Sequence, residues 1–145
     1  MDTVAEVLRY KGTVIHSIAP GTLVLSAVEE MCEKRIGALL VTQARVPLGI
    51  FSERDLLRRV ILARRDPATT RVEEVMTTDV VCVGPQTPAK EAMAIMTERR
   101  CRHLPVVEGG EVIGMLSIGD LVRWMSLEQT FEIQTLTDYV RGAYP

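Results

Sequence analysis

Two short motifs hold the side chains with the clearest chemical potential, Gly49–Asp55 (GIFSERD) and Gly114–Asp120 (GMLSIGD). Each ends an apolar run with a serine and places an aspartate three residues later. A serine and an acid at this spacing can form a capping box, in which both side chains satisfy free N–H groups at a helix start. The same groups can hold a nucleotide, because a helix N-terminus attracts phosphate and a carboxylate accepts hydrogen bonds from a ribose diol. The residues alone leave both interpretations open.

The other reactive side chains form no recognisable catalytic or metal-binding pattern. His16 and His103 lie far apart in the sequence, and Cys32, Cys82 and Cys101 form no Cys-x-x-Cys pair. We interpret His16 as a packed or edge residue of a strand, whereas His103 fits either a buried histidine or a phosphate contact. Because no nucleophile is paired with a base and no Walker-type glycine loop is present, we expect no catalytic residue, no metal site and no enzyme activity.

Composition and charge indicate the size of the domain and argue against binding to nucleic acid or membranes. The 145 residues, 47% hydrophobic and 25% charged, suffice for one compact domain with an aliphatic core. A net charge of −2 gives no long-range attraction to nucleic acid or to an anionic membrane, and arginine doublets such as Arg58-Arg59 and Arg99-Arg100 are interpreted as solvated helix faces. No apolar run resembles a membrane span or a signal peptide, and unpaired cysteines suit a reducing compartment. We expect a cytoplasmic protein that binds neither nucleic acid nor membranes.

An internal repeat determines how the two motifs are positioned. Residues 14–60 align with residues 79–125 without a gap at an offset of 65, and the two Ser-x-x-Asp motifs coincide. Upstream, residues 4–8 resemble residues 72–76 at an offset of 68, so the first copy carries three extra residues around Lys11-Gly12-Thr13. The chain therefore consists of two related halves.

Each copy predicts the same β-α-β-β-α series. The expected strands are 14–18, 38–42 and 48–51 in the first copy, and 80–83, 104–107 and 112–116 in the second. Thr22 and Thr87 are the expected N-caps of the first helix, with Pro88 at the first helical position, and second helices are expected from Glu53 and Ile118. Hairpin turns are expected at 43–47 and 108–111. The predicted fold class is α+β (α/β), with two small sheets covered by helices and packed together.

The expected domain division follows the repeat. Residues 1–63 form the first repeat, 64–71 a connector, 72–125 the second repeat, and 126–145 a C-terminal helix and tail. One copy alone would have a marginal core, so the two copies should bury their open faces on each other. The tail helix should dock on the module or on a partner subunit.

The whole chain resembles a known family, the tandem pair of cystathionine-β-synthase-type (CBS) domains. The resemblance rests on the doubled Gly-φ-φ-Ser-x-x-Asp motif, on Arg102-His103-Leu104-Pro105-Val106, and on Glu73-Glu74-Val75-Met76 at the start of the second repeat. With its short tail, the chain is similar to stand-alone, single-module CBS proteins. That resemblance implies two clefts related by pseudo-two-fold symmetry that accept AMP, ADP, ATP, NAD(H) or S-adenosylmethionine.

The resemblance also implies roles for individual residues. In one cleft, Asp120 would hold the ribose, Ser117 the sugar or phosphate, and Arg102 and His103 would face the phosphate. The adenine there would lie against four residues of the first copy: Thr13, Ile15, Ile36 and Ala38. In the other cleft the sugar would be held by Ser52 and Asp55, the base would lie near Thr78, Val80 and Cys101, and Arg54 would reach a phosphate. The two sites would be unequal, with the Asp120 site the tighter for a monophosphate.

The function expected on this basis is non-catalytic. The module would sense energy or redox state through an adenosine-containing ligand and change the conformation of a homodimer, thereby biasing an unidentified protein partner. Two alternatives stay open: a dimerisation scaffold whose motifs only cap helices, and a nucleotide-hydrolysing enzyme. The expected dimer contacts are the apolar tail helix and the helix over 56–62.

Overall fold

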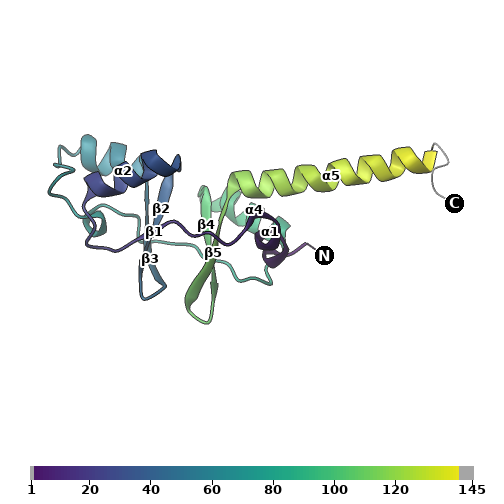
Figure 1. Ribbon diagram of the computed structural model, residues 1–145, viewed down its shortest axis with the longest axis horizontal. Helices are drawn as coiled ribbons and strands as arrows, with labels where there is room; N and C mark the ends of the chain where they lie inside the picture. The colour runs from purple at the N-terminus through teal and green to yellow at the C-terminus, as the bar shows by residue number, and fades with distance from the viewer. Residues whose placement is uncertain (1, 141–145) are drawn as a thin grey trace.

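Two small β-sheets form the centre of the molecule. The computed structural model describes the backbone of residues 2–140 and the side chains of residues 2–127, 129 and 133. In the first sheet, β1 (Ser17–Ile18) runs parallel to β2 (Ala38–Gln43), which pairs antiparallel with β3 (Val46–Ser52). In the second sheet, β4 (His103–Glu108) pairs antiparallel with β5 (Glu111–Ser117). The two hairpins stand side by side (Figure 1), as the repeat predicts.

Helices flank the sheets at both ends. The first half contributes α1 (Val4–Lys11), α2 (Val24–Lys34) and the short α3 (Glu53–Asp55), which continues as the π-helix η1 (Leu56–Ile61). The second half contributes the 3-10 helix η2 (Val72–Glu74), α4 (Ala89–Arg99) and α5 (Ile118–Val140). The expected starts at Glu53 and Ile118 are confirmed. So are the two hairpin turns, where Ala44-Arg45 and Gly109-Gly110 both adopt positive φ, as tight hairpins of the right twist require.

The strand expected over 80–83 is wrong, and a proline explains the difference. In the first copy, the Leu40 N–H donates to the His16 carbonyl at 3.0 Å and helps hold β1 against β2. The equivalent residue of the second copy is Pro105, which has no N–H to donate. Only Val83 pairs there, accepting from the Val107 N–H at 2.8 Å and donating to the Pro105 carbonyl at 3.0 Å.

The expected helix caps and tail also differ from the structure. The N-cap residues of α2 and α4 are Leu23 and Pro88, one residue after the predicted threonines, and neither has a side-chain cap. Thr87 instead accepts a hydrogen bond from the Gly84 N–H. The tail is not a separate helix, because α5 continues without a break from the second repeat to Val140 and extends away from the sheets (Figure 1). Residues 141–145 of the predicted tail lie outside the described residues.

Each half completes the hydrophobic core of the other half. Val4, Val7 and Leu8 of α1 are buried with the side chains of α4, β4 and β5, whereas Val72 and Val75 are buried with those of α2, β2 and β3. Matching backbone hydrogen bonds fix this exchange. The Val4 N–H donates to the Thr87 carbonyl and the Val72 N–H to the Thr22 carbonyl, both at 2.8 Å.

A third apolar cluster joins the two sheets. It consists of Leu40 from β2 with Val112 and Met115 from β5, and Ile15 and Ile50 pack against it. The Val112 N–H also donates to the Arg45 carbonyl across the two hairpins at 2.9 Å. These contacts hold the two sheets against each other. They therefore also set the relative positions of the ends of β3 and β5, where the two Ser-x-x-Asp motifs lie.

Candidate nucleotide-binding cleft

Both Ser-x-x-Asp motifs form capping boxes at strand-to-helix junctions. At the end of β3, the Ser52 N–H donates to Asp55 Oδ2 at 3.0 Å, and the Asp55 N–H donates to Ser52 Oγ at 3.3 Å. At the end of β5, the corresponding distances between Ser117 and Asp120 are 2.8 and 3.1 Å. The capping interpretation is confirmed at both junctions. Each carboxylate is thereby held in place, and its remaining partners decide what else it can bind.

Each half packs one segment on the other half, α1 in the first copy and residues 72–77 in the second. The motif glycines allow these exchanged segments to approach the sheets. A Cβ on Gly49 would lie 2.6 Å from Met76 Sδ and 2.8 Å from the Thr77 carbonyl oxygen, because residues 76–77 cross β3 at this point. A Cβ on Gly114 would lie 2.8 Å from a methyl group of Leu8. The sequence signal for this contact is the upstream similarity of residues 4–8 to residues 72–76, which brings Leu8 and Met76 to equivalent places.

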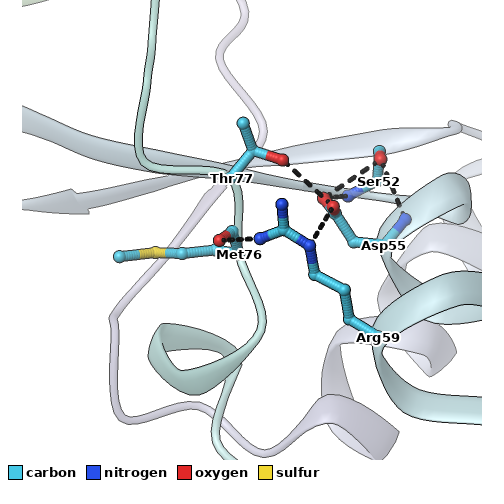
Figure 2. A network of polar contacts seen from close by, with 5 residues as sticks. All are labelled: Ser52, Asp55, Arg59, Met76 and Thr77. Carbon is cyan, nitrogen blue, oxygen red and sulfur yellow. Dashed lines mark hydrogen bonds and ion pairs between the residues drawn. The ribbon is translucent and has the colours of Figure 1, made fainter. Parts of the chain in front are cut away.

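The close approach at Gly49 gives Asp55 a partner outside its own helix start. Thr77 and Ile50 exchange two backbone hydrogen bonds of 2.9 Å, and the Thr77 hydroxyl donates to Asp55 Oδ1 at 3.0 Å. Arg59 donates to the Met76 carbonyl at 2.8 Å and lies with Nε 3.7 Å from Asp55 Oδ1. Figure 2 shows Ser52, Thr77 and Arg59 converging on the Asp55 carboxylate, and the separate contact from Arg59 to Met76. Asp55 is only 5% exposed, so the network ties a nearly buried charge to the second half of the chain.

A cavity of about 640 Å³ opens beside Asp55, between the two halves. Five of the six residues predicted for this cleft line it: Ser52, Arg54, Asp55, Val80 and Cys101. Thr78 is not among the lining residues, although its neighbours Thr77 and Asp79 are. Arg102 and His103, which were predicted for the Asp120 cleft, line this cavity too. Ile50 and Val81 add apolar surface.

Arginines dominate the charge of this cavity. Five of them line it: Arg54, Arg58, Arg99, Arg100 and Arg102. The carboxylates that line it are Glu53, Asp55 and Asp79. Guanidinium groups bind phosphate through paired N–H donors, so the excess of positive charge favours an anionic ligand. Arg58, Arg99 and Arg100 were not predicted as site residues, because in the sequence their doublets resemble ordinary solvated helix faces.

The surroundings of the Asp120 junction are different. The Lys11 ammonium donates to Asp120 Oδ2 at 2.7 Å and to the Met115 carbonyl at 2.5 Å. Burial of Asp120 acts to raise its pKa, but hydrogen bonds from Lys11 and from the Ser117 backbone outweigh it and hold the pKa below its usual value. Lys11 was not predicted, because no local pattern links it to a residue 109 positions away.

The four residues predicted to hold an adenine near Asp120 lie apart from the cavity beside Asp55, and they line no second cavity together among the two that the described part of the structure shows. Ile15 packs against the cluster between the sheets, Ala38 is 6% exposed, and Thr13 is exposed. Ile36 lines a smaller cavity of about 380 Å³ between α2 and α3. Asp120 lines neither of these two cavities.

His103 lies between the two junctions. It is the first residue of β4 and pairs in register with Ser117, while its side chain lines the Asp55 cavity. Burial lowers its pKa and the charges of Lys11 and Arg102 lower it further, with Asp120 opposing them. The neighbouring Cys101 thiol has a pKa raised by burial, which disfavours a reactive thiolate.

Among the described residues, no group of three or more histidine, cysteine or carboxylate side chains is placed to hold a metal ion. Within the same part of the chain, no helix combines the length and apolar character needed to cross a membrane.

Comparison with known proteins identifies the fold family. The sequence model of the CBS domain family matches residues 3–62 and 72–127 of this chain. The chain is 35% identical over 151 aligned positions to the mitochondrial CBS domain-containing protein CBSX3 of Arabidopsis thaliana, covering 98% of this chain and 73% of that protein. It also resembles the solved structure of a protein with CBS domains from Burkholderia ambifaria MC40-6, with a TM-score of 0.82 and 45% identity, covering 88% of this chain and 96% of that one.

A third relative was solved with a ligand. The structure of CBSX2 in complex with AMP matches with a TM-score of 0.75 and 26% identity, covering 89% of this chain and 99% of that one. The predicted resemblance is thus confirmed over both repeats, in sequence and in architecture. The chain belongs to the CBS domain family, as a single module built from two CBS domains.

Proposed function

We propose that this module binds an adenosine-containing nucleotide in the cavity beside Asp55 and acts as a non-catalytic regulatory unit. The observation that carries the proposal is the combination of a capped, nearly buried carboxylate with five arginines around one cavity between the halves. The AMP complex of the related CBSX2 supports an adenosine ligand. AMP, ADP, ATP, NAD(H) and S-adenosylmethionine all carry the adenosine group that this proposal requires.

The lining residues divide by chemistry into three groups. Asp55 and Ser52 would bind the ribose hydroxyls, since a ligand hydroxyl can replace the Thr77 hydroxyl on Asp55 Oδ1 one for one. The exposed arginines would bind the phosphates. Val80, Val81 and Ile50 would contact the base, which needs an apolar surface rather than a charge.

Regulation would follow from the position of the cavity. Its walls come from residues 37–58 of one half and 77–103 of the other, so a ligand would contact both halves at once. A ligand shifts a conformational equilibrium only as far as its affinities for the two states differ. A module of this kind could sense energy or redox state and bias a protein partner, whose identity stays open. Its cytoplasmic location stays a prediction.

The test is ligand-dependent melting with AMP, ATP and NADH. A ligand at 100 times its dissociation constant should add about 2.7 kcal/mol of stability, which for a domain of this size raises Tm by about 5–10 °C. Asp55→Asn should abolish the shift, and Asp120→Asn, which alters the equivalent capping box, is the matched control and should keep it. Loss of the Tm shift in Asp120→Asn but not in Asp55→Asn would indicate that the nucleotide binds at the Asp120 junction. No shift with any adenosine compound would favour a scaffold without a ligand.

A second part of the proposal is homodimerisation. Apolar side chains are exposed on the second helix of each repeat: Leu57, Ile61 and Leu62 on η1 and just after it, and Val122 and Leu127 on α5. Leu57 and Val122 are equivalent in the two repeats, as are Leu62 and Leu127, so the patches are related by the internal pseudo-symmetry. Sedimentation should report a dimer that Leu62→Glu weakens. Val14→Glu, at an exposed residue outside these helices, is the control, and a monomeric wild-type protein would refute the proposal.

A further inference from the structure

The two junctions are alike in their capping boxes but unlike in the third partner of the acid. Asp55 receives a neutral hydroxyl from Thr77 at 3.0 Å, whereas Asp120 receives the ammonium of Lys11 at 2.7 Å. Both contacts come from the exchanged segment that packs on the opposite half, so the difference arises at equivalent places in the fold.

We propose that Lys11 closes the Asp120 junction to nucleotides, so that the chain carries one open nucleotide site instead of two. This inference rests on the proposed function, because it assumes that a capped aspartate of this kind binds a ribose. Lys11 is then the residue that determines the number of sites. It acts by occupying the carboxylate and touches no ligand at the Asp55 cavity.

The charge of the hydrogen-bond donors supports this assignment. Oδ2 accepts two hydrogen bonds at both junctions, from the Ser52 N–H at 3.0 Å and the Ser52 hydroxyl at 3.1 Å at Asp55, and from the Ser117 N–H at 2.8 Å and Lys11 at 2.7 Å at Asp120. Both donors at Asp55 Oδ2 are neutral, whereas one of the two at Asp120 Oδ2 is charged. A ribose diol gains most when it can bind both carboxylate oxygens. At the Asp120 junction a diol would have to displace a charged donor, and charged donors form stronger hydrogen bonds than neutral ones.

The ammonium group also has little freedom to leave. It is held by the Met115 carbonyl as well as by Asp120, and the Lys11 side chain is only 22% exposed. Removing one partner of a partly buried ion pair leaves the other charge without compensation. Displacement of the Thr77 hydroxyl from Asp55 carries no such penalty, because no net charge is uncovered and Arg59 Nε stays 3.7 Å from Asp55 Oδ1.

The difference between the two junctions arises from the extra residues of the first copy. Its exchanged segment forms α1, eight residues long, which Gly12 ends with φ 101°. The equivalent segment of the second copy is the three-residue helix η2. The longer helix carries Lys11 in its last turn and delivers it to Asp120, whereas the segment after η2 delivers Thr77 to Asp55.

The experiment measures ATP stoichiometry per chain by titration calorimetry on four full-length proteins: wild type, Lys11→Met, Lys11→Met with Asp120→Asn, and Lys34→Met. Lys34 forms an exposed ion pair of the same length with Glu30 and serves as the control. We expect one site in wild type and in Lys34→Met, two in Lys11→Met, and one in the double variant. If Lys11→Met does not fold, Lys11→Gln, which keeps a donor for the Met115 carbonyl, should also give two.

The possible outcomes separate this inference from the proposed function. Two sites in wild type, or one site in both wild type and Lys11→Met, overturns the role of Lys11 and leaves nucleotide binding intact. No site in wild type but one in Lys11→Met overturns binding at Asp55 and supports the role of Lys11. No site in either protein overturns both.

Discussion

Substitution of Gly49 by alanine tests whether the crossing of residues 76–77 over β3 builds the Asp55 site. The added Cβ would lie 2.6 Å from Met76 Sδ, 2.9 Å from Met76 Cγ and 2.8 Å from the Thr77 carbonyl oxygen. The methionine can rotate away, but the carbonyl belongs to the backbone that pairs with Ile50. The variant therefore has to push the crossing segment off the strand.

The expected cost follows from the kind of atom that must move. Overpacking of a well-packed interior costs about 1–3 kcal/mol, and a backbone clash should put Gly49→Ala near the upper end, at about 3 kcal/mol. Gly114→Ala meets only methyl groups of Leu8, at 2.8 and 2.9 Å, and should cost about 1 kcal/mol. Gly21→Ala, with nothing within 4 Å and an ordinary φ, is the control and should change stability by less than about 1 kcal/mol.

The assay is urea unfolding of the three variants, together with the ATP-dependent Tm shift. Gly49→Ala should lower the unfolding midpoint most and should also weaken the Tm shift, because the displaced segment carries Thr77, Asp79 and Val80, which line the cavity. An unfolding free energy for Gly49→Ala within about 0.5 kcal/mol of wild type would refute the reasoning. So would a larger loss in Gly114→Ala than in Gly49→Ala.

Three further predictions concern single side chains. Burial lowers the pKa of His103 in the folded state, so the unfolded chain binds more protons below about pH 6.5. The unfolding free energy should therefore fall as pH decreases through that range, and His103→Gln should flatten this dependence. Thr77→Val removes one donor from Asp55 and should cost about 1 kcal/mol in urea unfolding, with no change pointing to a water in its place. Leu8→Ala should cost about 2–5 kcal/mol, since Leu8 is 4% exposed in the core of the other half, and a loss below 1 kcal/mol would argue against that packing.

Much of the architecture was accessible from the sequence. The offset of 65 predicted two related halves, the Ser-x-x-Asp spacing predicted the capping boxes at Ser52 and Ser117, and Gly109-Gly110 predicted a hairpin. These features depend on neighbours in the chain or on a repeated pattern, so local chemistry suffices to predict them. Five residues that line the Asp55 cavity followed from the family resemblance: Ser52, Arg54, Asp55, Val80 and Cys101.

Other features depended on contacts that no local pattern encodes. The missing strand over 80–83 follows from Pro105, whose effect lies on the neighbouring strand rather than on the segment itself. The placement of Arg102 and His103 on the Asp55 side, and of Arg99 and Arg100 beside them, follows from how the two sheets meet.

The duplicated α+β architecture and the two capped acids follow from the sequence, because the repeat is visible at an offset of 65 and each capping box joins residues only three positions apart. The difference between the two acids appears only in the tertiary structure: the segment exchanged between the halves brings a hydroxyl to Asp55 and an ammonium to Asp120. The reason is physical: each third partner arrives on a segment exchanged between the halves, and the length of that segment determines which side chain reaches the carboxylate.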